Sequence, residues 1–203
     1  MYIDKHHILN YNKAMFIEAK QKLDKMLSRK FAVFTNAVFP SNLFVFGGAI
    51  RDVILSNEIK DLDLFVLTKN KSKILDFVKQ NGFCYSLNSF NNPKISYGGI
   101  NIDFCPIKNI SEVIFFNSDG LFYNFSTGKF VVTKEFEDFI KTEKVEIVNH
   151  KEVHPNPKRI IERKSKVESF AKFIFSQQNI QTLKREMQNK NLFEREINQE
   201  IVL

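Results

Sequence analysis

Three aspartates lie in strand-like parts of the sequence, at spacings that would let their carboxylates share a cation. Asp61 and Asp63 flank Leu62 at the start of an apolar run, and Asp103 lies in a second, alternating run. Side chains two positions apart in a strand leave the same face of a sheet, so Asp61 and Asp63 point the same way. Adjacent carboxylates repel each other, and a divalent cation is the commonest reason to place them together. These three residues are therefore the candidate metal ligands and catalytic groups.

A pair of glycines upstream of these aspartates is suited to binding phosphate. Gly47 and Gly48 follow the apolar segment Leu43–Phe46 and precede apolar residues at helical spacing. A tight turn between a strand and a helix directs free backbone N–H groups at one point. Arg51 can add a charge-assisted contact with phosphate, and we expect Asp52 to cap backbone amides or to orient Arg51. These four polar and glycine positions are the predicted nucleotide-binding residues.

Carboxylates on neighbouring strands beside a phosphate-binding turn suit a two-metal reaction of a nucleoside triphosphate. One Mg²⁺ ion would lower the pKa of an attacking hydroxyl, and a second would neutralise the pyrophosphate leaving group. We expect Asp61 and Asp63 to bind the metals and Asp103 to hold the ion at the attacking hydroxyl.

The elements expected around these residues are those of a mixed α/β protein. The carboxylates lie in predicted strands at 62–67 and 100–107, and the glycine turn lies between a strand at 43–46 and a helix at 49–55. Other elements are expected as helices at 13–38, 73–80 and 136–141, strands at 83–87, 95–97 and 145–148, a hairpin at 121–133, and one or two helices from 158 to the end.

Composition limits the function classes. The chain has 203 residues, enough for one good-sized core, and a net charge of +7 that suits RNA but equally a charged, solvated surface. No apolar run approaches the roughly 20 residues of a membrane span, and the N-terminus lacks a signal-peptide pattern. We therefore expect a cytoplasmic protein with no membrane partner. Cys84 and Cys105 are expected to be buried, and Phe170, Phe173 and Phe175 to pack on the core rather than stack on RNA.

The chemical motifs resemble the head domain of class II tRNA nucleotidyltransferases (CCA-adding enzymes) and bacterial poly(A) polymerases, in the DNA polymerase β-like superfamily. The family signature Gly-Gly-x-Val-Arg-Asp, Leu-Leu-Gly and Asp-x-Asp stands here as Gly47–Asp52, Ile54–Ser56 and Asp61–Asp63, at the same spacing. Ile102–Phe104 resembles the third-carboxylate strand of the family, and Leu121–Gly128 its strand-turn-strand. The resemblance covers about residues 40 to 175. It implies a nucleotidyltransferase head with a short, twisted mixed sheet, preceded by an N-terminal helical arm (1–40), spanning 41–150 and followed by a helical extension (151–203).

Two segments differ from the family pattern. The family's Arg-Arg-Asp-Phe-Thr-Ile-Asn-Ala segment falls at 113–120, where this chain has no arginine. The neck motif Glu-Asp-x-x-Arg, whose Asp and Arg read the incoming base in the family, maps to Glu162, Arg163 and Lys166, so a cation replaces a carboxylate. We also expect the body and tail that grip tRNA in the family to be absent.

The resemblance implies metal-dependent transfer of a nucleoside monophosphate from ATP or CTP to a hydroxyl, with release of pyrophosphate. An RNA 3′ end is the acceptor that it favours. A small molecule or a protein side chain is an alternative acceptor, because neither would need the tRNA-gripping domains. A degenerate head that binds RNA or a partner without turnover is the other alternative: the lost arginines favour it, and the three retained carboxylates oppose it. The terminal helices are a candidate surface for a homodimer.

Overall fold

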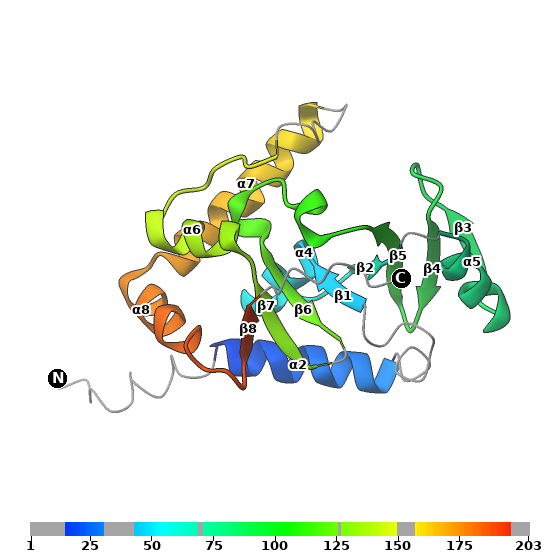
Figure 1. The fold of residues 1–203 in the computed structure, drawn as a ribbon, viewed down its shortest axis with the longest axis horizontal. Coiled ribbons are helices and arrows are strands. Elements are labelled where there is room, and N and C mark those ends of the chain that lie inside the picture. Colours follow the sequence, from blue (N-terminus) through cyan, green and yellow to red (C-terminus); the bar gives the residue numbers. More distant parts are fainter. Residues whose placement is uncertain (1–14, 31–42, 69–70, 126, 150–156, 196–203) are drawn as a thin grey trace.

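An eight-stranded mixed sheet forms the centre of the molecule (Figure 1). The computed structural model describes residues 15–30, 43–68, 71–125, 127–149 and 157–195. The strand order is β3-β4-β5-β2-β1-β6-β7-β8. Strands β2 and β5 pair in parallel, as do β7 and β8, and the other neighbouring pairs are antiparallel. The strands are β1 (Leu43–Phe46), β2 (Asp61–Leu67), β3 (Tyr85–Leu87), β4 (Pro93–Tyr97), β5 (Ile100–Ile107), β6 (Leu121–Asn124), β7 (Lys129–Val132) and β8 (Phe193–Arg195).

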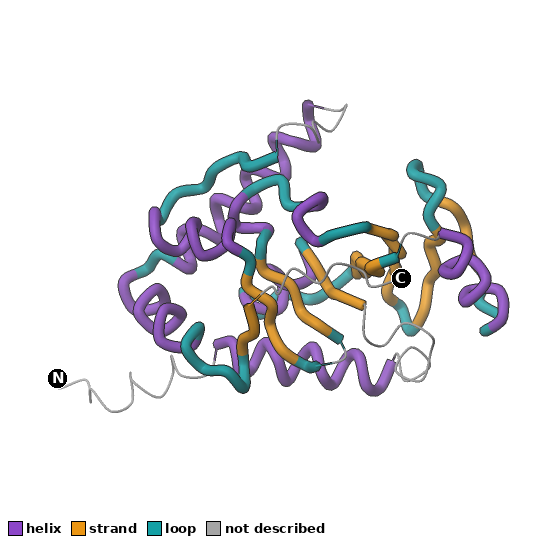
Figure 2. Tube along the Cα trace, viewed as in Figure 1, coloured by secondary structure: helices purple, strands orange, loops and turns teal. Residues whose placement is uncertain are grey.

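Helices pack against this sheet, which confirms the mixed α/β class (Figure 2). Helix α5 lies at the β3–β4 end, and α6, α7 and α8 gather toward the other end (Figure 1). No helix in the described ranges is long and apolar enough to cross a bilayer. The helices are α2 (Met15–Lys30), α4 (Gly48–Ile54), α5 (Lys71–Gln80), α6 (Lys134–Thr142), α7 (Pro157–Ile174) and α8 (Gln177–Glu186), with 3-10 turns η2 (Ile110–Val113) and η3 (Asn117–Asp119).

The two faces of the sheet carry different apolar clusters. Along β2, Leu62 and Leu64 enter the main core, which also contains residues from α2, α4, α5, α7 and α8. Phe65 and Leu67 alternate with them and join a second cluster that includes Ile110 of η2. Because side chains alternate along a strand, the second cluster lies on the face that also carries Asp61 and Asp63. Asp63, which is half-buried, therefore lies at the edge of an apolar cluster, whereas Asp61 at the start of the strand is exposed.

The N-terminal helix packs against the main core. Phe16, Leu23 and Leu27 recur at helical spacing along α2 and are buried, as expected. The hydroxyl of Tyr123 donates a hydrogen bond to Asp24, and burial together with this bond raises the pKa of Tyr123. The described part of the expected 13–38 helix is thus confirmed from residue 15 to 30, and the rest lies outside the described residues.

Two expected elements differ in the structure. The expected strand at 145–148 forms a single bridge, between Ile147 and Phe116, because the neighbouring segment turns into η3 and cannot continue a ladder. The region after α8, expected to be helical, contains β8. The ring of Phe193 lies 5.2 Å from that of Phe16 and 5.6 Å from that of Phe130, so aromatic packing overrides a composition that favours helix.

The predicted packing of the C-terminal phenylalanines is confirmed, and that of one cysteine is wrong. Phe170 is buried, and the ring of Phe175 lies 4.7 Å from that of Phe139. Phe173 is partly buried against the same core. Cys105 is half-buried, but Cys84 is exposed because it precedes β3, an edge strand whose residues are all exposed.

A buried carboxyl at the end of α8 makes stability depend on pH. Neither side-chain oxygen of Glu186 has a hydrogen-bond partner among the described residues, and burial raises its pKa from 4.5 to about 7, against the lowering effect of Arg185. We therefore expect the contribution of Glu186 to stability to fall as the pH rises from about 4.5 to 7. We expect Glu186→Gln to raise the free energy of unfolding at pH 8 by about 2 kcal/mol and to change it little at pH 4. Urea titrations at both pH values measure this, and exposed Glu58→Gln is the control that should show no such difference.

Candidate active site

Strand register aligns polar side chains across one face of the sheet. Lys94 of β4 lies opposite Asp103 of β5, which in turn lies opposite Asp63 of β2. Two positions before these on β5 and β2, Asn101 lies opposite Asp61. Paired positions on adjacent strands share a face and are roughly 4.8 Å apart. The sheet thus brings the three predicted carboxylates together. We call these five side chains the polar row.

Electrostatic repulsion acts on the central carboxylate of this row. Asp63 is half-buried, and burial raises its pKa to about 6, with the charges of Asp103 and Asp61 adding to the increase. Arg163 and Lys94 oppose the increase. A carboxylate in this setting gains stability from any cation that binds beside it, because the cation offsets both burial and repulsion.

Protein donors occupy the third carboxylate. Lys94 Nζ lies 3.1 Å from Asp103 Oδ2, and Asn88 Nδ2 donates to Asp103 Oδ1 at 3.0 Å. The hydrogen bond with Asp103 raises the pKa of Lys94, while burial acts against it. Asn101 Nδ2 donates to Asp61 Oδ1 at 3.1 Å. Within the described ranges, no group of three carboxylates, imidazoles or thiols is placed to hold a metal ion. The direction of Asp103 toward Lys94 and Asn88 gives a physical reason.

The glycine turn lies directly beside the polar row. Gly47 has φ 68° and ψ −122°, in the region that favours glycine, and its carbonyl accepts a hydrogen bond from the backbone N–H of Arg51 at 3.3 Å. A Cβ added to Gly47 would lie 4.0 Å from Asp63 Oδ2, whereas one on Gly48 would meet nothing within 4 Å. The chain takes this path because Phe46, the last residue of β1, pairs with Asp63. The predicted phosphate-binding turn and the predicted metal ligands are therefore neighbours.

The arginine of the glycine motif is held by a carboxylate that the sequence did not single out. Arg51 Nη1 donates to Asp119 Oδ1 at 2.8 Å, and both side chains are buried. Asp119 therefore orients Arg51, a role that the sequence suggested for Asp52. The Asp52 carboxylate instead accepts a hydrogen bond from Asn57 Nδ2 at 3.4 Å.

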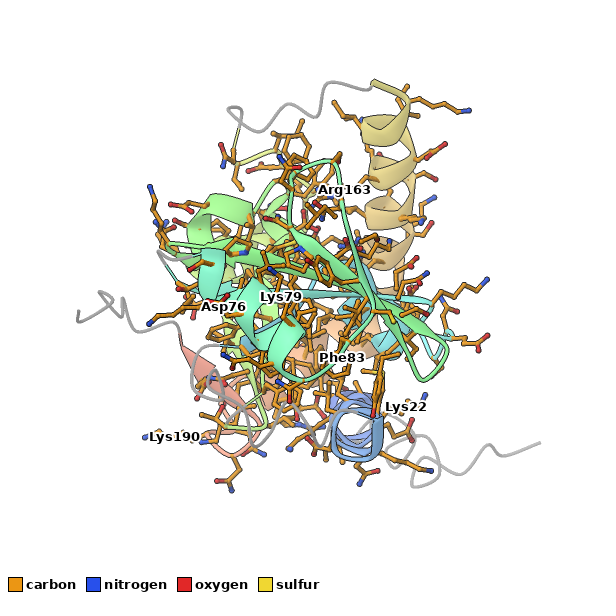
Figure 3. All side chains as sticks on the ribbon, turned by 90° about the vertical axis from the view of Figure 1, so that its right-hand side faces the viewer. Lys22, Asp76, Lys79, Phe83, Arg163 and Lys190 are labelled. Carbon is orange, nitrogen blue, oxygen red and sulfur yellow. The ribbon has the colours of Figure 1, made fainter. Side chains whose placement is uncertain are left out.

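Asp119 also receives an arginine from α7. Arg163, which is labelled in Figure 3, donates from Nη2 to Asp119 Oδ2 at 2.8 Å, and its guanidinium lies 5.6 Å from the ring centroid of Phe115. The backbone N–H of Phe116 donates to the same oxygen at 3.0 Å. This buried carboxylate joins α4, η3 and α7. A signal was present in the sequence, because position 163 carries a cation where the family pattern has a carboxylate, but its partner 44 residues away had no local signature.

Comparison with known proteins finds likeness in solved structures alone. No protein-family model matches the sequence, and the comparison with curated proteins finds no match. A tRNA-processing enzyme determined with CTP is 13% identical, with 83% of this chain and 46% of that chain covered and a TM-score of 0.47. A tRNA nucleotidyltransferase determined with a primer tRNA and an incoming ATP analogue is 13% identical over 74% and 54% of the two chains, with a TM-score of 0.47. The Thermotoga maritima CCA-adding enzyme complexed with tRNA is 15% identical over 91% and 48%, with a TM-score of 0.45.

The chain spans about half the length of these proteins. At such identities and scores the likeness does not extend to a family, a substrate or a catalytic residue.

Proposed function

We propose that this protein is a metal-dependent nucleotidyltransferase, which transfers a nucleoside monophosphate from a triphosphate to a hydroxyl group and releases pyrophosphate. The observation that carries the proposal is the placement of Gly47 beside Asp63, with a Cβ position 4.0 Å from the carboxylate oxygen. A turn with a free approach to its backbone and a cluster of carboxylates are the two parts that phosphoryl chemistry requires at one place. Their adjacency arises from the antiparallel pairing of β1 and β2.

Mg²⁺ fits the donor chemistry of the polar row. Asp61 and Asp63 offer carboxylate oxygens from one strand face, and the raised pKa of Asp63 reflects a site where a positive charge is favourable. These two residues would hold the metal, which when bound supplies charge neutralisation at the phosphates. Asp103 would orient the acceptor hydroxyl on the far side of Asp63. The backbone N–H groups of the Gly47–Gly48 turn would bind the triphosphate, with ATP or CTP as the nucleotide.

The acceptor that we propose is an RNA 3′ end. We also propose that the protein is cytoplasmic. The net charge of +7 supports an RNA acceptor, because phosphate contacts made by lysines and arginines supply most of the affinity for nucleic acids. A small-molecule or protein acceptor is the alternative within the same chemistry. A degenerate head that binds nucleotide without turnover is a second candidate function, and the hydrogen bonds that both Asp103 oxygens accept within the protein favour it.

Pyrophosphate release tests the proposal directly. The protein is incubated with Mg²⁺, each of the four nucleoside triphosphates and total RNA, beside the double variant Asp61→Asn/Asp63→Asn. We expect release by the parent, loss of release in the double variant and no change in Asp76→Asn, an exposed carboxylate on α5 (Figure 3). Binding to RNA should weaken steeply with salt, whereas a small-molecule acceptor predicts little salt dependence.

The failing outcomes separate the alternatives. Magnesium-dependent thermal stabilisation by a triphosphate, without pyrophosphate release on RNA, would point to another acceptor or to the degenerate head. Neither release nor stabilisation with any triphosphate would show that the nucleotidyltransferase proposal is wrong.

A further inference from the structure

We propose that the ammonium group of Lys94 takes the position of one metal ion, the ion expected at Asp103, so that the site binds one divalent cation rather than two. The inference rests on the proposed function and concerns how that site is built. Lys94 and Asp103 are directly opposite each other in the antiparallel β4–β5 register, and therefore leave the same face of the sheet. The register places the two side chains opposite each other, and Lys94, whose side chain is 38% exposed, reaches Asp103 Oδ2 at 3.1 Å.

The second oxygen of Asp103 has an equally fixed donor. Asn88 directs its amide nitrogen at Asp103 Oδ1 at 3.0 Å. The other end of the same amide is held in place, because Asn88 Oδ1 accepts hydrogen bonds from the backbone N–H groups of Phe90 at 2.9 Å and Asn92 at 3.1 Å. The β3–β4 turn therefore orients Asn88 so that its NH₂ group faces the carboxylate. Each oxygen of Asp103 therefore already has a donor that the fold positions, and a metal ion there would lie beside the Lys94 ammonium, whose charge repels it.

The charges of the row also fit a single ion. Three carboxylates and one ammonium leave two negative charges among Asp61, Asp63, Asp103 and Lys94, which one Mg²⁺ neutralises. Arg163 and Arg51 share the single Asp119 carboxylate, which leaves one further positive charge beside the row and makes a second divalent ion less favourable still. The ion at Asp61 and Asp63 would then bind the triphosphate. Beside Asp103, where the acceptor hydroxyl would lie, Lys94 would supply the positive charge in place of a metal ion.

Counting bound Mn²⁺ tests this inference without measuring activity. Mn²⁺ replaces Mg²⁺ at oxygen ligands, and its electron paramagnetic resonance signal reports both the number of bound ions and the coupling between two ions held close together. The full chain is titrated with Mn²⁺ in the presence of a non-hydrolysable ATP or CTP analogue. We expect one ion per chain in the parent and in Lys94→Arg, which keeps the cation. We expect two coupled ions in Lys94→Met, which removes the charge but keeps much of the side-chain volume.

Matched variants and outcomes keep the inference distinct from the proposed function. Lys79→Met, an exposed lysine on α5 (Figure 3), should bind one ion like the parent. Two coupled ions in the parent, or one ion in Lys94→Met, would overturn the inference while the proposed function stands. If neither the parent nor any variant binds Mn²⁺ or the nucleotide analogue, the proposed function is wrong, and the inference with it.

Discussion

Replacing Asp119 with Asn is expected to lower the free energy of unfolding by about 3 to 5 kcal/mol, the usual effect of stranding a buried charge. The Asp119 side chain is fully buried and accepts hydrogen bonds at 2.8 Å from both Arg51 and Arg163. Asparagine keeps the shape but removes the charge, and its NH₂ group would face the guanidinium donors. The loss of the negative charge destabilises Arg51 most, because its side chain is only 11% exposed and cannot be rehydrated unless α4 moves. Urea denaturation followed by circular dichroism measures the change.

Single arginine variants show where the effect arises. Arg163 is 38% exposed at its side chain, so solvent screens its pairing, and we expect Arg163→Met to lower stability by no more than about 1 kcal/mol. In the double variant Arg51→Met/Asp119→Asn no unpaired charge remains inside α4, so it should be more stable than Asp119→Asn alone. A loss below about 1 kcal/mol for Asp119→Asn would contradict the view that this carboxylate holds the glycine-motif helix in place.

The sequence predicted those parts of the site that a short pattern of consecutive residues encodes. The alternation of Asp61 and Asp63 around a buried Leu62 indicated a strand with its carboxylates on one face, and β2 confirms it. The alternation Asn101–Asp103 indicated a third carboxylate nearby, and the parallel β2–β5 register places Asp103 next to Asp63. Each inference needed a few consecutive residues, because strand geometry alone fixes which side chains share a face.

The rest of the site depends on register and on contacts between distant segments, which no local pattern encodes. Arg51 contacts Asp119, which lies 68 residues away in the sequence. Lys94 lies opposite Asp103 only because β4 and β5 pair in one particular register. A shift of that register by one residue would turn Lys94 to the other face. The segment 113–120 was notable in the sequence for the arginines it lacks. In the structure, Asp119 of this segment forms ion pairs with Arg51 of α4 and Arg163 of α7.

Asp63→Asn is expected to stabilise the protein at pH 8 in the presence of EDTA, by about 2 kcal/mol. Burial and the charges of Asp103 and Asp61 raise the pKa of Asp63 from 3.8 to about 6. The folded state therefore holds this proton more tightly than the unfolded state, and the contribution of Asp63 to stability falls as the pH rises from about 4 to 6. Asparagine removes the charge, so its advantage should be absent at pH 3.5 and complete at pH 8. Urea titrations at the two pH values, with Asp76→Asn as the exposed control, measure the difference.

The stability advantage of Asp63→Asn over the parent should disappear or reverse when Mg²⁺ and a triphosphate are present. Ligands that bind the folded state raise its melting temperature, and a carboxylate destabilised by repulsion gains most when a cation arrives. We therefore expect Mg²⁺ with a triphosphate to raise the melting temperature of the parent and to leave that of Asp63→Asn nearly unchanged. Such a crossing would show that this carboxylate is kept at the expense of stability for a ligand's sake. An Asp63→Asn protein that is less stable than the parent at pH 8 in EDTA would instead mean that donors within the protein already satisfy the charge, and that no cation is needed there.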